Sequence, residues 1–214
     1  MKESAEGPRE RRRTETVNSL VRAARIATAE HGLHCFTIEE LCEQAGVSRR
    51  TFFNYFASKE DAILGIPLHR DDAALIEAFL AGGSDGGGIS SHLLDDLAAL
   101  TVARWRSMDI APDTASELVA AVDREPRLLA RILTLTNDGE REDADLVARR
   151  EHLAPGDVRA EVAAITIGAL CRAATSEYLA TERAVAFEEI FTRRLDAARS
   201  LFATQIARPV EGPL

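Results

Sequence analysis

Cysteines, aromatic residues and long apolar runs are all scarce in this sequence, and each scarcity excludes a class of protein. The three cysteines form no CxxC pair and the five histidines show no metal-ligand spacing, so we expect no disulfide, no metal and no cofactor. The longest nearly apolar run, residues 162–171, is shorter than the roughly 18 residues of a membrane span. Because the N-terminus is charged rather than apolar, we expect a cytoplasmic protein without a membrane partner.

Residues that favour strands are also few. Only 5% of the chain is aromatic, whereas Ala, Leu, Glu and Arg, which favour helices, are plentiful. The sequence shows neither an alternating strand pattern nor an internal repeat. It therefore predicts an all-α protein of about nine helices.

The formal net charge of −9 is the opposite of a nucleic-acid-binding surface. Its distribution changes that interpretation, because residues 1–64 carry ten basic and ten acidic side chains and all the excess acid follows them. Arginines gather within residues 9–13 and again at Arg49 and Arg50, as a small DNA-contacting surface requires. The first cluster is also typical of a solvated disordered tail, which we expect for residues 1–13.

The first part of the chain shows the start and stop signals of short helices. Apolar spacing over residues 14–31 predicts a helix, which Gly32 ends. Thr37, followed three residues later by Glu40, forms a capping box that starts a second helix.

A tight turn separates this second helix from a third. Gly46 supplies the turn, and Ser48 caps a helix over about residues 49–55. Two short helices joined in this way predict a helix-turn-helix, whose second helix enters the DNA major groove. Its core positions are Leu41, Cys42, Ala45, Val47, Phe52 and Phe56. The residues left exposed are Arg49, Arg50, Thr51, Asn54 and Tyr55.

The exposed set is rich in groups that read a DNA groove. Arg bonds guanine bidentately, Thr touches a thymine methyl group, and Asn and Tyr reach a base or a phosphate. Thr37 and the start of the second helix offer N–H groups to a phosphate, and Lys59 supplies a charge on the far side.

The segment TIEELCEQAGVSRRTFFNYFASKEDAIL resembles the DNA-binding domain of the TetR family of regulators, and the resemblance covers about residues 14–64. The residues that carry it are Thr37, Ile38, Cys42, Ala45 to Ser48, Thr51, Phe52, Phe53 and Tyr55 to Glu60. The resemblance implies DNA contacts at Thr37, Ser48, Arg49, Arg50, Thr51, Phe53, Asn54, Tyr55 and Lys59. The chain departs from the family at Phe53, where many members have Tyr, and at Ala57, where many have Pro.

The rest of the chain matches the family in architecture only. A helix from Ser58 to Leu80, bent at Pro67, joins the two parts, and the glycine-rich residues 82–88 read as a flexible linker. The helix after Pro126 is either continuous or broken at residues 137–139. The expected division is a tail (1–13), a DNA-binding domain (14–64), a ligand-binding and dimerisation domain (65–207) and a second tail (208–214).

The sequence predicts two last helices, one over about residues 158–179 and one that follows residues 181–184 and ends near residue 207, and they carry the strongest apolar stripes. They resemble half of a four-helix bundle that a second copy completes, and a two-fold DNA site also requires a two-fold protein. The residues expected at this homodimer interface are Ala164, Gly168, Phe187, Phe191, Leu195 and Phe202. The alternative is that the stripe packs inside one chain.

A small-molecule pocket is expected among the later helices. The candidate lining residues are Trp105, Met108, Leu118, Leu133, Cys171 and Tyr178, each of which ordinary core packing also explains. Arg104, Arg131 and Glu177 are candidate polar anchors, and a solvated helix face explains them equally well.

The leading hypothesis is a homodimeric repressor that a small-molecule effector releases from a palindromic double-stranded DNA operator. An all-α small-molecule-binding protein or enzyme is the alternative, but the sequence contains no G-x-S-x-G, H-E-x-x-H or phosphate-binding loop, so we expect no enzyme. A redox sensor at Cys35 or Cys42 is a third hypothesis. Both cysteines are expected to be buried, and buried cysteines are usually unreactive. The sequence does not distinguish a repressor from an activator, and it identifies neither the effector nor the operator sequence.

Overall fold

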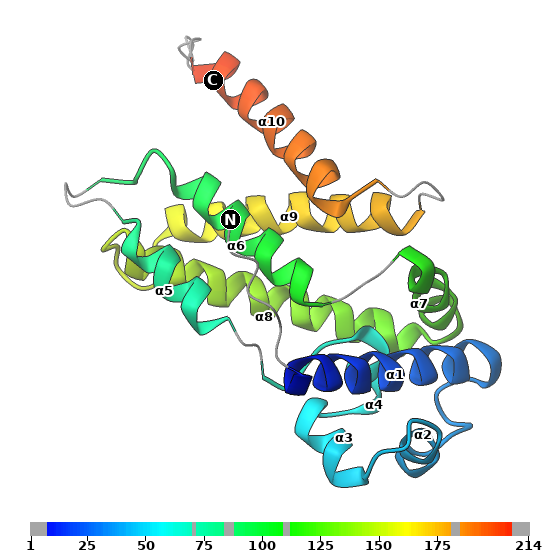
Figure 1. Ribbon diagram of the computed structural model, residues 1–214. Helices are drawn as coiled ribbons and strands as arrows, with labels where there is room; N and C mark the ends of the chain where they lie inside the picture. Colours follow the sequence, from blue (N-terminus) through cyan, green and yellow to red (C-terminus); the bar gives the residue numbers. More distant parts are fainter. Residues whose placement is uncertain (1–7, 70–71, 84–87, 109–111, 181–184, 207–214) are drawn as a thin grey trace. The chain divides into compact units, whose positions relative to one another are not determined.

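The computed structural model describes residues 8–69, 72–83, 88–108, 112–180 and 185–206, and for residues 8–11, 107, 112–114 and 202–206 it describes the backbone only. These residues form ten α-helices and contain no strand (Figure 1). The predicted all-α class is confirmed. The chain divides into two compact units, each built from two stretches of sequence.

Unit 1 comprises Met1–Glu77 and Ala103–Asp138. Its complete helices are α1 (Pro8–His31), α2 (Ile38–Gln44), α3 (Arg49–Tyr55), α4 (Lys59–Leu64) and α7 (Pro112–Arg124). Helix α1 lies at its centre and packs against α2, α4 and α7. Fully buried side chains on α1, α3 and α4 form the core, among them Leu20, Phe52 and Ile63. The first three helices therefore share one core with α7, so this division does not coincide with the boundary expected after residue 64.

Unit 2 comprises Ala78–Val102 and Gly139–Leu214. Its complete helices are α9 (Val158–Ala180) and α10 (Phe187–Ile206), which pack against each other. Three more helices contribute residues to both units: α5 (Ala73–Ala81), α6 (Leu93–Ser107) and α8 (Pro126–Arg150).

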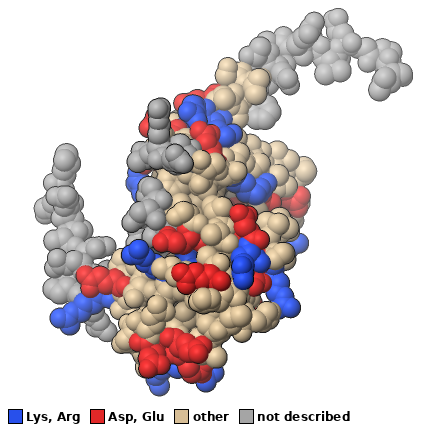
Figure 2. Space-filling view, turned by 90° about the vertical axis from the view of Figure 1, so that its right-hand side faces the viewer, with Lys and Arg blue, Asp and Glu red and all other residues tan. Residues whose placement is uncertain are grey.

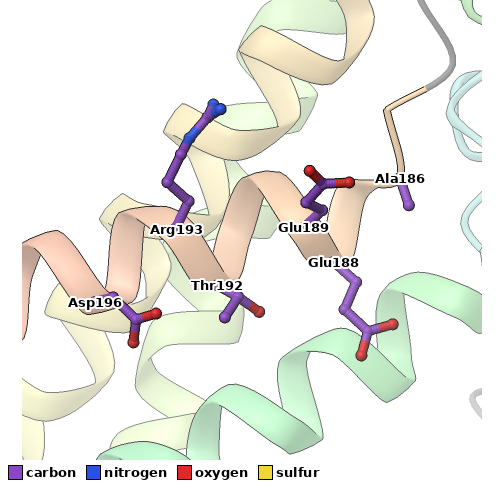
Figure 3. A pocket seen from close by; sticks show the side chains of 6 residues that line it. All are labelled: Ala186, Glu188, Glu189, Thr192, Arg193 and Asp196. Carbon is purple, nitrogen blue, oxygen red and sulfur yellow. The ribbon is translucent and has the colours of Figure 1, made fainter.

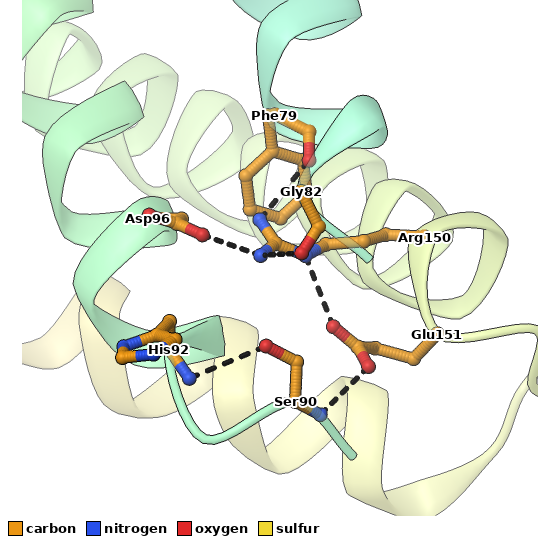
Figure 4. A network of polar contacts seen from close by, with 7 residues as sticks. All are labelled: Phe79, Gly82, Ser90, His92, Asp96, Arg150 and Glu151. Atoms are coloured by element: carbon orange, nitrogen blue, oxygen red, sulfur yellow. Dashed lines mark hydrogen bonds and ion pairs between the residues drawn. The ribbon is translucent and has the colours of Figure 1, made fainter. Parts of the chain in front are cut away.

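A buried arginine network joins the ends of three helices in unit 2 (Figure 4). The side chain of Arg150, at the end of α8, is fully buried and donates to the carbonyls of Phe79 at 3.0 Å and Gly82 at 2.7 Å. It pairs with the buried Glu151 at 3.0 Å and with Asp96 of α6. The glycine run expected to be a linker thus begins in close packing, and a Cβ at Gly83 would collide with the Arg150 backbone. Residues 84–87 of that run lie outside the described residues.

Two expected helices have different bounds from those predicted. Helix α1 begins at Pro8 rather than Thr14, so part of the expected disordered tail is helical. Proline suits the first helical position and arginine favours helix, which accounts for this start. Helix α8 is continuous through residues 137–139, because one interior glycine costs only about 1 kcal/mol and buried residues lie on both sides of it.

The predicted helix from Ser58 to Leu80 is wrong, because it is two helices. Helix α4 ends at Leu64, and the following Gly65 has a left-handed φ of 75°. The Ile66 N–H closes that end by donating to the Asp61 carbonyl at 2.8 Å. Pro67 has no N–H with which to continue the helix. This break makes ten helices rather than about nine.

Candidate nucleic-acid interface

Reciprocal bonds fix the N-terminus of α2. The Glu40 N–H donates to Thr37 Oγ1 at 3.1 Å, and the Thr37 N–H donates to Glu40 Oε2 at 2.6 Å. The predicted capping box is therefore present. The bond from the Thr37 N–H, with that from its hydroxyl, holds the pKa of Glu40 below its ordinary value. Because the Thr37 N–H is engaged here, a phosphate contact from Thr37 stays a prediction.

The turn between α2 and α3 depends on one residue with left-handed backbone. Gly46 has a φ of 67°, which costs glycine little. The Val47 N–H then returns to the Cys42 carbonyl at 2.9 Å and closes α2. Ser48 caps α3 by accepting the Thr51 N–H at 3.1 Å. Helices α2 and α3 pack together as the predicted helix-turn-helix requires.

Buried aromatic rings fix the orientation of α3. Phe52 and Phe56 are fully buried, with ring centroids 5.7 Å apart, and Leu41 of α2 is buried with them. Ala45 and Val47, also expected in this core, are only half-buried. The opposite side of α3 presents Arg49, Arg50, Phe53 and Asn54 as exposed residues and Thr51 and Tyr55 as half-buried ones. The predicted base-reading residues therefore lie on the exposed side of one helix.

Arg49 lies between an acidic and an aromatic side chain. Its Nη1 is 2.9 Å from Glu39 Oε1 of α2, and its guanidinium carbon is 5.5 Å from the Phe53 ring centroid. Phe53 in turn meets the buried Phe52 ring edge-on at 5.3 Å. The ion pair is exposed, so its contribution to folding is at most about 1 kcal/mol. It places the guanidinium between Glu39 and the Phe53 ring.

Lys59 makes contacts within the chain, and the phosphate contact expected of it stays a prediction. Its ammonium donates to the carbonyls of Leu33 and Phe36, each at 2.7 Å, and lies 4.5 Å from the Phe36 ring centroid. These bonds hold the turn between α1 and α2. The N–H of Leu33 donates to Glu125 Oε1 at 2.8 Å, so the same turn is also bound by the end of α7.

Two further buried contacts stabilise α4. Asp61, which is buried, pairs with Arg131 of α8 at 2.8 Å. The buried Arg25 of α1 donates to the Ile63 carbonyl at 2.9 Å. Sequence reasoning did not assign Glu125 or Arg131 to this motif. They lie 92 and 70 residues from their partners, and no local pattern signals such a contact.

Charge is mixed on the face drawn in Figure 2, where acidic and basic side chains alternate over the described surface. In the motif, the exposed arginines of α3 have Glu39, Glu40 and Glu43 on the neighbouring α2. Affinity for a polyanion must therefore come from a few well-placed cations rather than from a broad basic patch on this face.

The expected pocket residues are divided between the two units. Trp105, Met108, Leu118 and Leu133 belong to unit 1, whereas Cys171 and Tyr178 belong to unit 2. Trp105 and Leu118 are buried core residues, and Leu133 is 56% exposed. Tyr178 meets the Phe187 ring edge-on at 6.5 Å.

The three expected polar anchors are all engaged in ion pairs. Arg104 pairs with Asp72 at 2.8 Å, and Arg131 pairs with Asp61. Glu177 pairs with Arg194 at 2.7 Å and with Arg193. These pairs fix helices together, so they do not support a role as ligand anchors.

A described hollow on unit 2 lies along α10 and has a volume of about 560 Å³ (Figure 3). Its lining residues are Ala186, Glu188, Glu189, Thr192, Arg193 and Asp196. It shares no residue with the expected pocket. This hollow is open and is bordered by charged side chains from the start of α10, unlike the enclosed wall of most small-molecule sites.

Four of the six residues expected at a dimer interface are buried within the chain instead. Ala164, Phe187, Phe191 and Leu195 are buried, and the rings of Phe187 and Phe191 stack at 5.8 Å. Gly168 is half-buried against Glu140 of α8, and the Phe202 side chain lies outside the described residues. Monomer packing accounts for the stripe because α9 and α10 cover each other.

The exposed apolar residues of α9 lie on a different side of the helix. Val158, Val162 and Ile165 are 66%, 56% and 51% exposed. The exposed Ala169 continues the row at the same helical spacing.

Cys35 is exposed, contrary to the expected burial, whereas Cys42 is buried. Burial raises the pKa of the Cys42 thiol, which disfavours the reactive thiolate. Among the described residues, no helix is long and apolar enough to cross a membrane, and no cluster of three acidic, His or Cys side chains is placed to hold a metal ion.

Comparison with known proteins agrees with the motif. Residues 20–64 match the model of the family described as bacterial regulatory proteins, tetR family. The chain is also 30% identical over 148 residues to the HTH-type transcriptional regulator TcmR of Streptomyces glaucescens. That match covers 68% of this chain and 64% of the relative, so the chain spans less than two thirds of its length. Both matches are to regulators, which agrees with the prediction that the chain is not an enzyme. The chain belongs to the TetR family of bacterial regulatory proteins.

Proposed function

We propose that this protein is a cytoplasmic DNA-binding transcriptional regulator that represses its target as a homodimer and is released by a small molecule. The observation that carries the DNA-binding role is the exposed side of α3. Arg49, Arg50 and Asn54 project from a helix that Phe52 and Phe56 fix from behind. These are side chains that bond base edges and phosphates.

The homodimer is supported by the exposed apolar row of α9, formed by Val158, Val162, Ile165 and Ala169. Such a row is costly to leave in water, and a second copy supplies an identical row across a two-fold axis. Two recognition helices would then meet half-sites one DNA turn apart, about 34–36 Å.

The proposed release from DNA by an effector is supported by the polar contacts of the DNA-binding helices with α7 and α8. Glu125 binds the turn before α2, and Arg131 binds α4 through Asp61. An effector that favours another position of α7 or α8 would change these ties and lower operator affinity by its differential binding to the two states.

A mobility-shift assay on the DNA upstream of the protein's own gene tests the DNA-binding role. We expect a retarded band that Arg49→Ala and Arg50→Ala weaken by about 1–3 kcal/mol each if the contacts are bidentate. A folded dimer that retards no band at low salt would contradict the proposal.

Light scattering tests the interface. Ile165→Arg should convert the dimer to a monomer, whereas Leu133→Arg, at a similarly exposed apolar position of α8, should not. A dimer that tolerates Ile165→Arg, or a wild-type monomer, would refute this interface.

A further inference from the structure

The ion pair between α2 and α3 has a consequence for DNA selectivity. We propose that Glu39 is a positioning residue that directs Arg49 toward base edges and lowers the affinity of the motif for random DNA. This inference rests on the proposed DNA-binding function.

The contacts of Arg49 restrict where its charge can go. Glu39 holds Nη1 at 2.9 Å, and the Phe53 ring lies 5.5 Å from the guanidinium carbon. A guanidinium has five N–H donors, so these two contacts leave donors for the O6 and N7 atoms of a guanine. Phe53, expected to touch DNA, thereby acts as a support for Arg49, because the buried Phe52 ring fixes it in turn.

The neighbouring arginine shows the contrast. Arg50 is also exposed, but among the described residues no acidic side chain pairs with it. An arginine without such a partner can also reach the phosphate backbone of any sequence, and each phosphate neutralised adds affinity that carries no sequence information. The Glu39 carboxylate holds Arg49 away from the phosphate backbone and also repels phosphate itself.

The charge of Glu39 also acts on a second nearby group, the Cys42 thiol. Together with burial, its charge raises the pKa of the nearby Cys42 thiol, while Arg49 opposes that effect. The contact between Glu39 and the start of α3 is its ion pair with Arg49.

The test compares Glu39→Gln with Glu43→Gln, a variant that removes the same charge from an exposed position one turn along α2. The probes are a duplex enriched by the wild-type chain from a random-sequence pool and the unselected pool itself. Affinity for each is measured against NaCl concentration, and thermal melts confirm that both variants fold as the wild type does.

We expect Glu39→Gln to free Arg49 for one phosphate per subunit. The slope of log affinity against log salt for the unselected pool should steepen by about 0.9 per subunit, or about 1.8 for the dimer, which is about sixtyfold in dimer affinity between 1 M and 0.1 M salt. Affinity for the enriched duplex should stay level or fall, so the ratio of the two affinities drops by about the same factor. Glu43→Gln should change both affinities alike.

A double-mutant cycle separates positioning from simple charge removal. In an Arg49→Ala background, Glu39→Gln should behave like Glu43→Gln, whereas in an Arg50→Ala background its effect on the ratio should persist. An unchanged ratio in the single variant, or an effect that survives Arg49→Ala, would overturn the assignment of Glu39. A wild-type chain that enriches no sequence from the pool would instead overturn the proposed function, and this inference with it.

Discussion

Replacing Arg150 by Met removes the centre of the buried network in unit 2 while keeping most of the side-chain volume. The guanidinium satisfies the Phe79 and Gly82 carbonyls and pairs with Glu151 and Asp96, and it lies 4.6 Å from the Phe79 ring centroid. The carboxylate left behind at Glu151 is fully buried, and its second oxygen already accepts the Ser90 N–H at 2.8 Å. The substitution therefore leaves the buried Glu151 carboxylate without its ion-pair partner.

The magnitude follows from which groups lose their partners. Removing one member of a buried ion pair costs about 3–5 kcal/mol, and this range already includes its hydrogen bonds. The Gly82 carbonyl adds little, because its residue is exposed and water replaces the arginine there. Against a total stability of about 5–15 kcal/mol, the loss is large. At about 2–4 °C per kcal/mol for a chain of this size, we expect the melting temperature to fall by roughly 6–20 °C.

Thermal unfolding followed by circular dichroism measures this change, with urea unfolding as a second measure. Arg149→Met is the matched control, because Arg149 precedes Arg150 on α8 and is exposed, so its replacement should change stability by less than about 0.5 kcal/mol. Adding Glu151→Gln to Arg150→Met should raise the melting temperature above that of the single variant, because the stranded charge is gone. Equal melting temperatures for the Arg149 and Arg150 variants would refute the reasoning.

Three further predictions concern local features. Lys59→Met should weaken binding to every DNA sequence and lower stability, yet leave the salt slope unchanged, because its ammonium binds two backbone carbonyls rather than phosphate; a flatter slope in filter-binding titrations would restore the phosphate contact. Gly65→Ala should cost about 1–2 kcal/mol in urea unfolding, because φ is 75° and a Cβ would lie 3.2 Å from Arg25, and an unchanged midpoint would contradict this. Hydrogen bonds from Arg159 lower the pKa of Asp157 to about 2 from 3.8, so the stabilisation is present above pH 3.8 and is lost as pH falls through 2. In Asp157→Asn the melting temperature should therefore depend less on pH over that range. A pH dependence equal to that of the wild type would contradict the contribution of Asp157.

The motif itself was predictable because its signals are local. The capping box at Thr37, the turn at Gly46 and the cap at Ser48 each involve residues no more than five positions apart, so the sequence states them directly. The aromatic spacing of Phe52 and Phe56 likewise predicts one buried side of a helix. The remaining residues of α3 are then predicted to be exposed.

The apolar stripes of the last helices were predictable as stripes but not as interfaces. Phe187, Phe191 and Leu195 repeat at helical spacing, and that spacing says only that they are covered. Whether the cover is another part of the chain or a second copy depends on which helices meet. In the structure α9 covers them, and a different row on α9 stays exposed.

The sequence by itself determined the helical class, the helix-turn-helix and the family, because backbone capping, turn chemistry and hydrophobic period act over a few residues. Only the tertiary structure decided what the charged side chains do. Glu39 beside Arg49, Lys59 on two carbonyls and Arg150 at the meeting of three helices each depend on groups that the fold brings together. The free energy of a charge is set by its partners and its burial, and neither is written in the local sequence.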